Sequence, residues 1–181
     1  HVIPDSGNFC GRVQAALQLA QQGYLVTFGI TARSPETGYG YIRVGESISG
    51  TDGYRVERFV EKPNLEKAKG YVESGDYYWN SGIFVMRADT WLSEIDLYRP
   101  LILAACKSAF TRCKQDGTFV RVAADSFLAS PAESIDYAVM ENTTRAAILP
   151  IDTLWSDVGS WSSIWDISEH DSHGNVCKGD V

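Results

Sequence analysis

Cysteine and histidine are scarce in this sequence, and neither is spaced as a metal site requires. The 181 residues include four cysteines and three histidines, and no two cysteines form a C-x-x-C pair. This spacing excludes zinc ribbons and zinc fingers. We interpret the cysteines as reduced thiols of a cytosolic protein, and His170 and His173 as surface residues.

Basic residues and long apolar runs are also in short supply. Sixteen Lys and Arg face 23 Asp and Glu, which gives a net charge of −7. This balance excludes a general electrostatic surface for nucleic acid or for an anionic membrane. No apolar run reaches the length of a membrane span, and no signal peptide opens the chain. We expect a cytoplasmic location, with any phosphate-bearing ligand held by a few local cations, backbone amides or a metal.

The composition that remains is that of a globular domain. Hydrophobic residues make up 44% of the chain and charged residues 22%, which excludes a disordered or low-complexity protein. A chain of this length can bury roughly two-thirds of its surface and needs no disulfides to hold a core. It opens with His1 rather than methionine, which we interpret as the start of a piece of a longer protein.

Apolar periodicity indicates helices that alternate with strands. Apolar residues recur at helical spacing over 9–22, capped by Ser6 or Asn8, and 25–30 is a continuous apolar run typical of a strand buried on both faces. Further helices are expected at 64–73 (capped by Asn64), 89–99 (capped by Asp89), 101–114, 133–142 and 161–167, and further strands at 39–48, 54–60, 79–87, 119–122 and 146–151. The sequence predicts an α/β fold with a mixed, mainly parallel sheet flanked by helices. One domain would span 1–175, and 176–181 would begin a tail or a further domain.

The first segment that departs from a plain core pattern runs from 35 to 41. Gly38 and Gly40 flank Tyr39 at the start of a strand. Glycines at such a point allow the backbone to approach a ligand closely, although on this segment alone a turn into the strand is the favoured interpretation.

The second segment is Phe59-Val60-Glu61-Lys62-Pro63, at the end of a β run that the proline stops. Ligands of open α/β sheets bind at the carboxyl ends of strands. Lys62 is a compact positive charge suited to a phosphate. The alternative is a surface ion pair worth about 0–1 kcal/mol.

The third segment is an aromatic-rich strand that Asn80 and Ser81 interrupt, with Gly82 leaving room beside them. A buried asparagine must form hydrogen bonds or it costs about 1–3 kcal/mol. An amide beside aromatic rings suits the hydroxyl groups of a sugar, and a turn within a hairpin is the alternative.

The fourth segment runs from Trp155 to Trp161 and carries Asp157 before a helix start. One carboxylate together with phosphate oxygens and waters is a typical Mg²⁺ environment. A helix cap formed by Asp157 or Ser160 explains the pattern equally well.

Together these segments resemble the bacterial mannose-1-phosphate guanylyltransferases, including the form that also carries a mannose-6-phosphate isomerase domain. The matching strings are 36–42, 59–63, 79–84, 133–141 and 155–161, in that order and across nearly the whole chain. Glu61-Lys62-Pro63 is shared by many sugar nucleotidyltransferases, whereas the strings at 79–84 and 133–141 are more specific.

The resemblance implies a Rossmann-like nucleotidyltransferase fold and the reaction of GTP with mannose 1-phosphate to give GDP-mannose and pyrophosphate. Lys62 would hold the sugar phosphate and Glu61 the sugar hydroxyls. Gly40 would offer its backbone amide beside Tyr39, and Asn80 and Ser81 would line the sugar pocket. Asp157 would be one of two aspartates that bind Mg²⁺, so Lys62 and Asp157 are the predicted catalytic residues. A homo-oligomer is possible.

The chain also departs from the family pattern. The glycine-rich loop with its arginine, which cradles the triphosphate, and the second metal-binding aspartate would precede His1. Asn142 stands where a lysine is usual. We therefore expect these 181 residues to be the sugar-binding part of the transferase domain and to be inactive on their own.

Three other functions fit parts of the pattern. A sibling transferase would use another nucleotide or sugar phosphate. A catalytically silent paralogue would bind the sugar nucleotide and regulate a partner, but it would be expected to lose Lys62 or Asp157, and both are present. A lectin-like module would use the five tryptophans and nine tyrosines for sugar stacking, and it would bind mannose and mannose 1-phosphate alike.

Overall fold

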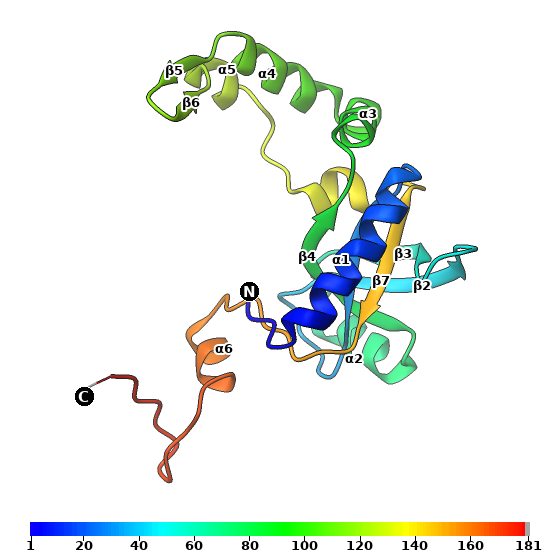
Figure 1. The fold of residues 1–181 in the computed structure, drawn as a ribbon, viewed down its shortest axis with the longest axis vertical. Helices are drawn as coiled ribbons and strands as arrows, with labels where there is room; N and C mark the ends of the chain where they lie inside the picture. Colours follow the sequence, from blue (N-terminus) through cyan, green and yellow to red (C-terminus); the bar gives the residue numbers. More distant parts are fainter. Residues whose placement is uncertain (180–181) are drawn as a thin grey trace.

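A five-stranded barrel forms the centre of the protein (Figure 1). The computed structural model describes residues 1–179, so the end of the predicted tail, 180–181, lies outside the described residues. The strands are β1 (Leu25–Thr31), β2 (Tyr41–Ser47), β3 (Tyr54–Val60), β4 (Tyr77–Val85) and β7 (Ala146–Ile151). They pair in the order β1-β4-β2-β3-β7, and β7 pairs with β1 to close the barrel.

The α/β class and the mixed sheet are confirmed, but the balance of strand directions differs from the prediction. Among the described residues, β1 and β7 pair in parallel, and the other pairs of the barrel are antiparallel. The reason is the short connection between β2 and β3, which allows only a hairpin. The strand β4 then fits between β1 and β2 and runs antiparallel to both.

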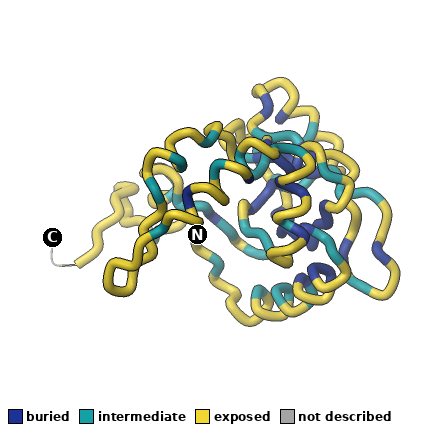
Figure 2. Tube along the Cα trace, turned by 90° about the horizontal axis from the view of Figure 1, so that it is seen from above, coloured by how far each residue is buried: buried dark blue, intermediate teal, exposed yellow. Residues whose placement is uncertain are grey.

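Helices cover both faces of the barrel wall. Helix α1 (Ser6–Gln21) and helix α2 (Leu65–Ser74) pack on one side, where Phe28, Tyr41 and Leu149 are fully buried. The other side holds a second cluster around Ile42 and Ile148, covered by α3 (Ala88–Tyr98) and the π-helix η1 (Asp136–Met140). Figure 2 shows the buried stretches gathered in this central region.

Helix caps were predicted correctly in part. The Asn64 side chain caps α2 by accepting a hydrogen bond from the Lys67 amide, and Ser160 caps α6 (Trp161–Asp166) in the same way. The predicted caps of α1 are wrong, because the Asp5 carboxylate reaches the Asn8 amide and starts the helix earlier. Asp89 is not the cap of α3 either, since it lies in the first turn and pairs with Arg87.

An arm extends away from the barrel in Figure 1. It consists of α4 (Pro100–Thr111), the two-stranded sheet of β5 (Lys114–Asp116) and β6 (Phe119–Arg121), and α5 (Ala124–Leu128). Strand β5 was not predicted, because its three residues carry no apolar pattern. Helix α4 packs on α5, and α3 connects the arm to η1.

Two further expectations concern the whole chain. All four cysteines are free thiols. Within residues 1–179, no helix combines the length and apolar character needed to cross a membrane.

Candidate active site

Three of the predicted segments meet at one end of the barrel. Tyr41, at the start of β2, pairs with Val60 at the end of β3 and with Trp79 in β4. This register places Gly40 beside Glu61 and Asn80. The Gly40 carbonyl accepts a hydrogen bond of 2.8 Å from the backbone N–H of Asn80. Residues that are far apart in sequence therefore line one edge.

Lys62 is held out towards solvent beside a buried carboxylate. Its Nζ lies 2.8 Å from Oε1 of Glu61, and the Glu61 side chain is 6% exposed whereas that of Lys62 is 57% exposed. The pKa of the Lys62 ammonium is raised by its hydrogen bond to Glu61. Lys62 also has a φ of +46°, which is unfavourable for a residue with a side chain. Such a conformation persists only where the surroundings impose it, which is common at binding sites.

Gly40 is required by close packing. A Cβ at this position would lie 2.6 Å from Oε2 of Glu61 and 3.2 Å from Cβ of Asn80. Any side chain would displace the Glu61 carboxylate. The predicted close approach was to a ligand, whereas the group that the structure places against Gly40 is Glu61.

Asn80 and Ser81 are both buried, at 8% and 2% exposure. In the Asn80 side chain, Oδ1 accepts a hydrogen bond of 2.8 Å from the Thr27 hydroxyl and Nδ2 donates one of 3.0 Å to Asp136. Ser81 points elsewhere, and its Oγ accepts from the Ile83 amide at 3.3 Å. Adjacent residues of a strand face opposite sides, so the two side chains lie in different surroundings.

Two carboxylates at this site, Asp136 in η1 and Glu141 directly after it, were not among the predicted site residues. Asp136 Oδ1 accepts from Asn80, and Glu141 Oε1 accepts from the Glu61 amide at 2.8 Å. Their only sequence signal is the string 133–141 that supports the resemblance. We call Glu61, Lys62, Asn80, Asp136 and Glu141 the lysine cluster.

Burial dominates the electrostatics of this cluster. It raises the pKa of Glu61, with a further upward contribution from Asp136 and Glu141, and Lys62 opposes the shift. Burial likewise raises the pKa of Asp136.

Asp157 lies in a separate cavity of about 660 Å³. We call it the tryptophan cavity; its lining includes Tyr39, Trp79, Trp155, Ser156, Asp157 and Ser160. The Tyr39 hydroxyl donates to Asp157 Oδ1 at 3.2 Å, and the Gly159 amide donates to the same oxygen at 3.0 Å. Burial, together with the Asp157 charge, raises the pKa of Tyr39 to about 12.

Strained backbone next to the tryptophan cavity is typical of a binding site. Val158 has a φ of +55°, so the backbone beside Asp157 is strained, as it is at Lys62. The indole N–H of Trp79 is buried and has no hydrogen-bond partner among residues 1–179. A buried donor without an acceptor costs about 1–3 kcal/mol and calls for an explanation in any native structure.

The two catalytic residues predicted from sequence therefore belong to two adjoining groups. Lys62 does not line the tryptophan cavity. The groups adjoin because two pairs of consecutive residues join them. Tyr39 lines the cavity and Gly40 packs against Glu61 of the lysine cluster. Trp79 lines the cavity and Asn80 belongs to the lysine cluster.

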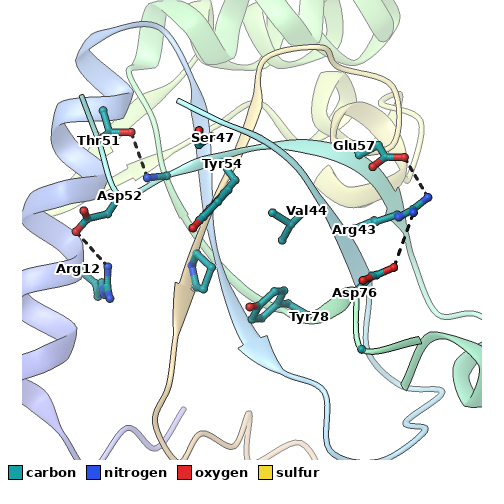
Figure 3. Close-up of a pocket in the computed structure, with 13 residues that line it drawn as sticks. Arg12, Arg43, Val44, Ser47, Thr51, Asp52, Tyr54, Glu57, Asp76 and Tyr78 are labelled. Atoms are coloured by element: carbon teal, nitrogen blue, oxygen red, sulfur yellow. Dashed lines mark hydrogen bonds and ion pairs between the residues drawn. The ribbon is translucent and has the colours of Figure 1, made fainter. Parts of the chain in front are cut away.

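The larger cavity of about 760 Å³ lies elsewhere and holds none of the predicted residues. Figure 3 shows it between β2, β3, β4 and α1, with Tyr54 and Tyr78 on its wall. Its arginines are paired with acids: Arg12 lies 3.4 Å from Asp52, and Arg43 lies 3.1 Å from Glu57. These pairs leave little positive charge for a phosphate.

Asp157 fits a divalent cation that is bound mainly by its substrate. In the part of the chain that the structure describes, no three His, Cys, Asp or Glu residues gather as metal ligands. Mg²⁺ commonly takes one or two carboxylates and completes its shell with waters and phosphate oxygens. One half-buried carboxylate at the wall of an open cavity matches that donor set.

Comparison with known proteins confirms the resemblance. The nucleotidyl transferase family model matches residues 1–174. The chain is 54% identical over its whole length to a mannose-1-phosphate guanylyltransferase of Escherichia coli, of which it covers 38%, and 52% identical to the xanthan biosynthesis protein XanB of Xanthomonas campestris, also covering 38%. It thus spans somewhat more than a third of the length of these curated relatives.

Two solved structures share the fold. A mannose-6-phosphate isomerase from Helicobacter pylori superposes with a TM-score of 0.78 at 34% identity, covering 86% of this chain and 60% of that one. A protein from Thermus thermophilus, described as a mannose-1-phosphate geranyltransferase, gives 0.79 at 29% identity, covering 95% and 48%. Nucleotidyltransferases generally use a divalent metal for phosphoryl chemistry. By sequence and by fold, this chain belongs to the nucleotidyl transferase family.

Proposed function

We propose that this chain is part of an enzyme that transfers GMP from GTP to mannose 1-phosphate, giving GDP-mannose and pyrophosphate. The observation that carries the proposal is the 54% identity to a mannose-1-phosphate guanylyltransferase across the whole chain. The exposed ammonium of Lys62, held on strained backbone beside buried carboxylates, supports a role in binding a phosphorylated sugar.

The chemistry needs little from acid or base groups. The attacking group is a phosphate oxygen that is already anionic at pH 7, so no side chain has to remove a proton. The barrier is the approach of one anion to another. Lys62 reduces this repulsion by placing a positive charge beside the sugar phosphate, and its hydrogen bond to Glu61 keeps it protonated.

The sugar would be held by neighbouring groups. Glu61 and Asn80 would bind hydroxyls and Ser81 would line the pocket, with the Gly40 backbone amide beside Tyr39. The Glu61 side chain is 6% exposed, so it would have to turn outwards to reach a hydroxyl. Asp157 would hold Mg²⁺, which when bound neutralises phosphate charge and aligns the displacement. Lys62 and Asp157 would thus act on the same substrate from two adjoining sides.

The proposal extends to the setting of the enzyme. Residues 1–175 would form the sugar-binding part of the transferase domain, with 176–181 beginning a tail. The enzyme would work in the cytoplasm, where GTP is available, without nucleic-acid or membrane partners, and a homo-oligomer is compatible with this role.

A pyrophosphate-release assay on the full-length protein that carries this chain tests the proposal. GTP, ATP, UTP and dTTP are each paired with mannose 1-phosphate and with glucose 1-phosphate, in Mg²⁺ or in chelator. We expect turnover with GTP, mannose 1-phosphate and Mg²⁺. Faster turnover with another pair would identify a sibling transferase, and binding without turnover would identify a silent paralogue. Equal affinity for mannose and mannose 1-phosphate would identify a lectin.

A further inference from the structure

A chain of hydrogen bonds links Thr27 of strand β1 to Asn80 and Asp136 of the lysine cluster. The Thr27 hydroxyl donates to Asn80 Oδ1 at 2.8 Å, the Gly82 amide donates to the same oxygen at 3.2 Å, and Asn80 Nδ2 donates to Asp136 Oδ1 at 3.0 Å. Thr27 is fully buried in a strand whose neighbouring positions are apolar. The single hydroxyl proton has two acceptors within reach, Asn80 Oδ1 at 2.8 Å and the Ile83 carbonyl at 3.3 Å, and the shorter contact is the one to Asn80.

These contacts permit only one orientation of the Asn80 amide. The Gly82 N–H can donate but cannot accept, so the atom facing it must be the amide oxygen. An ionised Asp136 can accept but cannot donate, so the atom facing it must be the nitrogen. Nδ2 carries a second N–H, and in the described part of the chain its one hydrogen bond is to Asp136. The contacts of Oδ1 and of the first N–H thus fix the direction in which the second N–H points.

The π-helix explains how Asp136 reaches Asn80 while Glu141 reaches Glu61. The Glu141 amide bonds to the Asp136 carbonyl at 3.0 Å, a bond between residues five apart. In an α-helix, residues five apart point in different directions, whereas this wider turn directs both carboxylates to the lysine cluster. Single π turns are frequent at functional sites.

We propose that Thr27 and Asp136 are positioning residues that hold the Asn80 amide in the one orientation that donates to a hexose hydroxyl, and that they thereby help to select the sugar. The inference rests on the proposed function. Neither residue has to touch the substrate, because each acts through the Asn80 side chain.

Thr27→Val and Thr27→Ser test this in the full-length protein. Valine keeps the shape of threonine without the hydroxyl, and serine restores the hydroxyl. We expect Thr27→Val to raise the KM for mannose 1-phosphate by about tenfold, as for the loss of one hydrogen bond. The preference of the enzyme for mannose 1-phosphate over glucose 1-phosphate should become smaller. The KM for GTP should not change, and Thr27→Ser should recover most of the loss.

A merely structural role would give a different pattern. If Thr27→Val lowered Tm and reduced activity with all substrates in proportion, or left the KM for mannose 1-phosphate unchanged, the inference would be overturned. Should Thr27→Val fail to fold, Asp136→Ala, which removes the acceptor at the partly exposed end of the chain of bonds, replaces it, with the same expected rise in KM for the sugar phosphate.

A measurement without substrate separates this inference from the proposed function. In protein labelled with ¹⁵N-asparagine, the side-chain NH₂ signals of Asn80, assigned by their loss in Asn80→Ala, should show two distinct environments in the wild type. In Thr27→Val they should shift and broaden. Unchanged signals would refute the positioning role even if the enzyme were active, whereas an inactive wild type with shifted signals would refute only the proposed function.

Discussion

The lysine cluster and the tryptophan cavity adjoin, yet they differ in how far the protein already satisfies their polar groups. In the lysine cluster, Glu61, Asn80 and Asp136 have partners within the chain and Glu61 is nearly inaccessible. In the tryptophan cavity, Asp157 lines an open space of about 660 Å³, and among residues 1–179 only its Oδ1 accepts hydrogen bonds, while Oδ2 has no partner.

This difference indicates separate tasks for the two groups. A network whose members are mutually bonded is rigid and selects shape, which suits recognition of a sugar. An open cavity with a single carboxylate suits a cation and phosphate oxygens, because these bring most of the ligands themselves. A residue with a positive φ lies in the first group, Lys62, and another lies next to Asp157 in the chain, Val158, so the backbone at both places is held by its surroundings rather than by local preference.

The largest expected effect is that of Lys62→Ala in the lysine cluster. Removing the ammonium leaves the approach of two anions uncompensated, and we expect kcat in the pyrophosphate-release assay to fall by about 100-fold or more. Lys69→Ala, which removes an exposed lysine of α2, is the matched control and should leave kcat unchanged. Equal kinetics in the two variants would show that Lys62 is only the surface partner of Glu61.

Asp157→Asn should have the next largest effect and should act on the metal. Asparagine can still accept the hydrogen bonds from Tyr39 and Gly159 but carries no charge. We expect the Mg²⁺ concentration for half-maximal activity to rise by about tenfold or more. Asp152→Asn is the control, because this exposed aspartate, paired with Arg33, does not line the cavity. An unaltered Mg²⁺ requirement would remove Asp157 from the metal site.

The sequence is informative where the pattern is local. The apolar run at 25–30 and the alternation at 54–60 predicted β1 and β3 almost to the residue. Lys62 at a strand end and the closely packed Gly40 were also identified, because proline and glycine mark such positions.

Contacts between distant segments left no comparable signal. The bond from Glu61 to Glu141 joins residues 80 positions apart, and that from Thr27 to Asn80 joins residues 53 apart. The sequence predicts an ordinary helix around Asp136, since a single π turn has the same composition as an α-helix. The antiparallel pairing of β4 depends likewise on which strands meet, which the composition of β4 does not reveal.

Glu61→Gln tests whether the buried carboxylate of the lysine cluster is kept at a cost in stability. Its folded-state pKa is raised above the usual 4.5 by burial, so its stabilising contribution is present below pH 4.5 and is lost as the pH rises through the folded value. Glutamine resembles the protonated form and avoids this loss. We expect Glu61→Gln to gain stability relative to wild type as the pH rises above 4.5, and to bind mannose 1-phosphate more weakly.

Chemical denaturation of wild type and Glu61→Gln at pH 4, 6 and 8 measures this difference. Glu66→Gln, which removes an exposed carboxylate in the first turn of α2, is the matched control for the change in net charge. A constant difference between pH 4 and pH 8 would contradict the raised pKa.

Tyr39→Phe should give the smallest effect and tests the wall of the tryptophan cavity. The hydroxyl donates to Asp157 at 3.2 Å, and its loss should cost about 1 kcal/mol of stability. Because the pKa of Tyr39 is raised from 10.0 to about 12, its contribution is complete below pH 10 and is lost between pH 10 and 12. Denaturation at pH 8 and pH 11.5 should therefore show the wild type losing its advantage over Tyr39→Phe at the higher pH. If instead the advantage stayed the same at both values, Tyr39 would not be bonded to Asp157, and the carboxylate would be free to turn fully towards a bound cation.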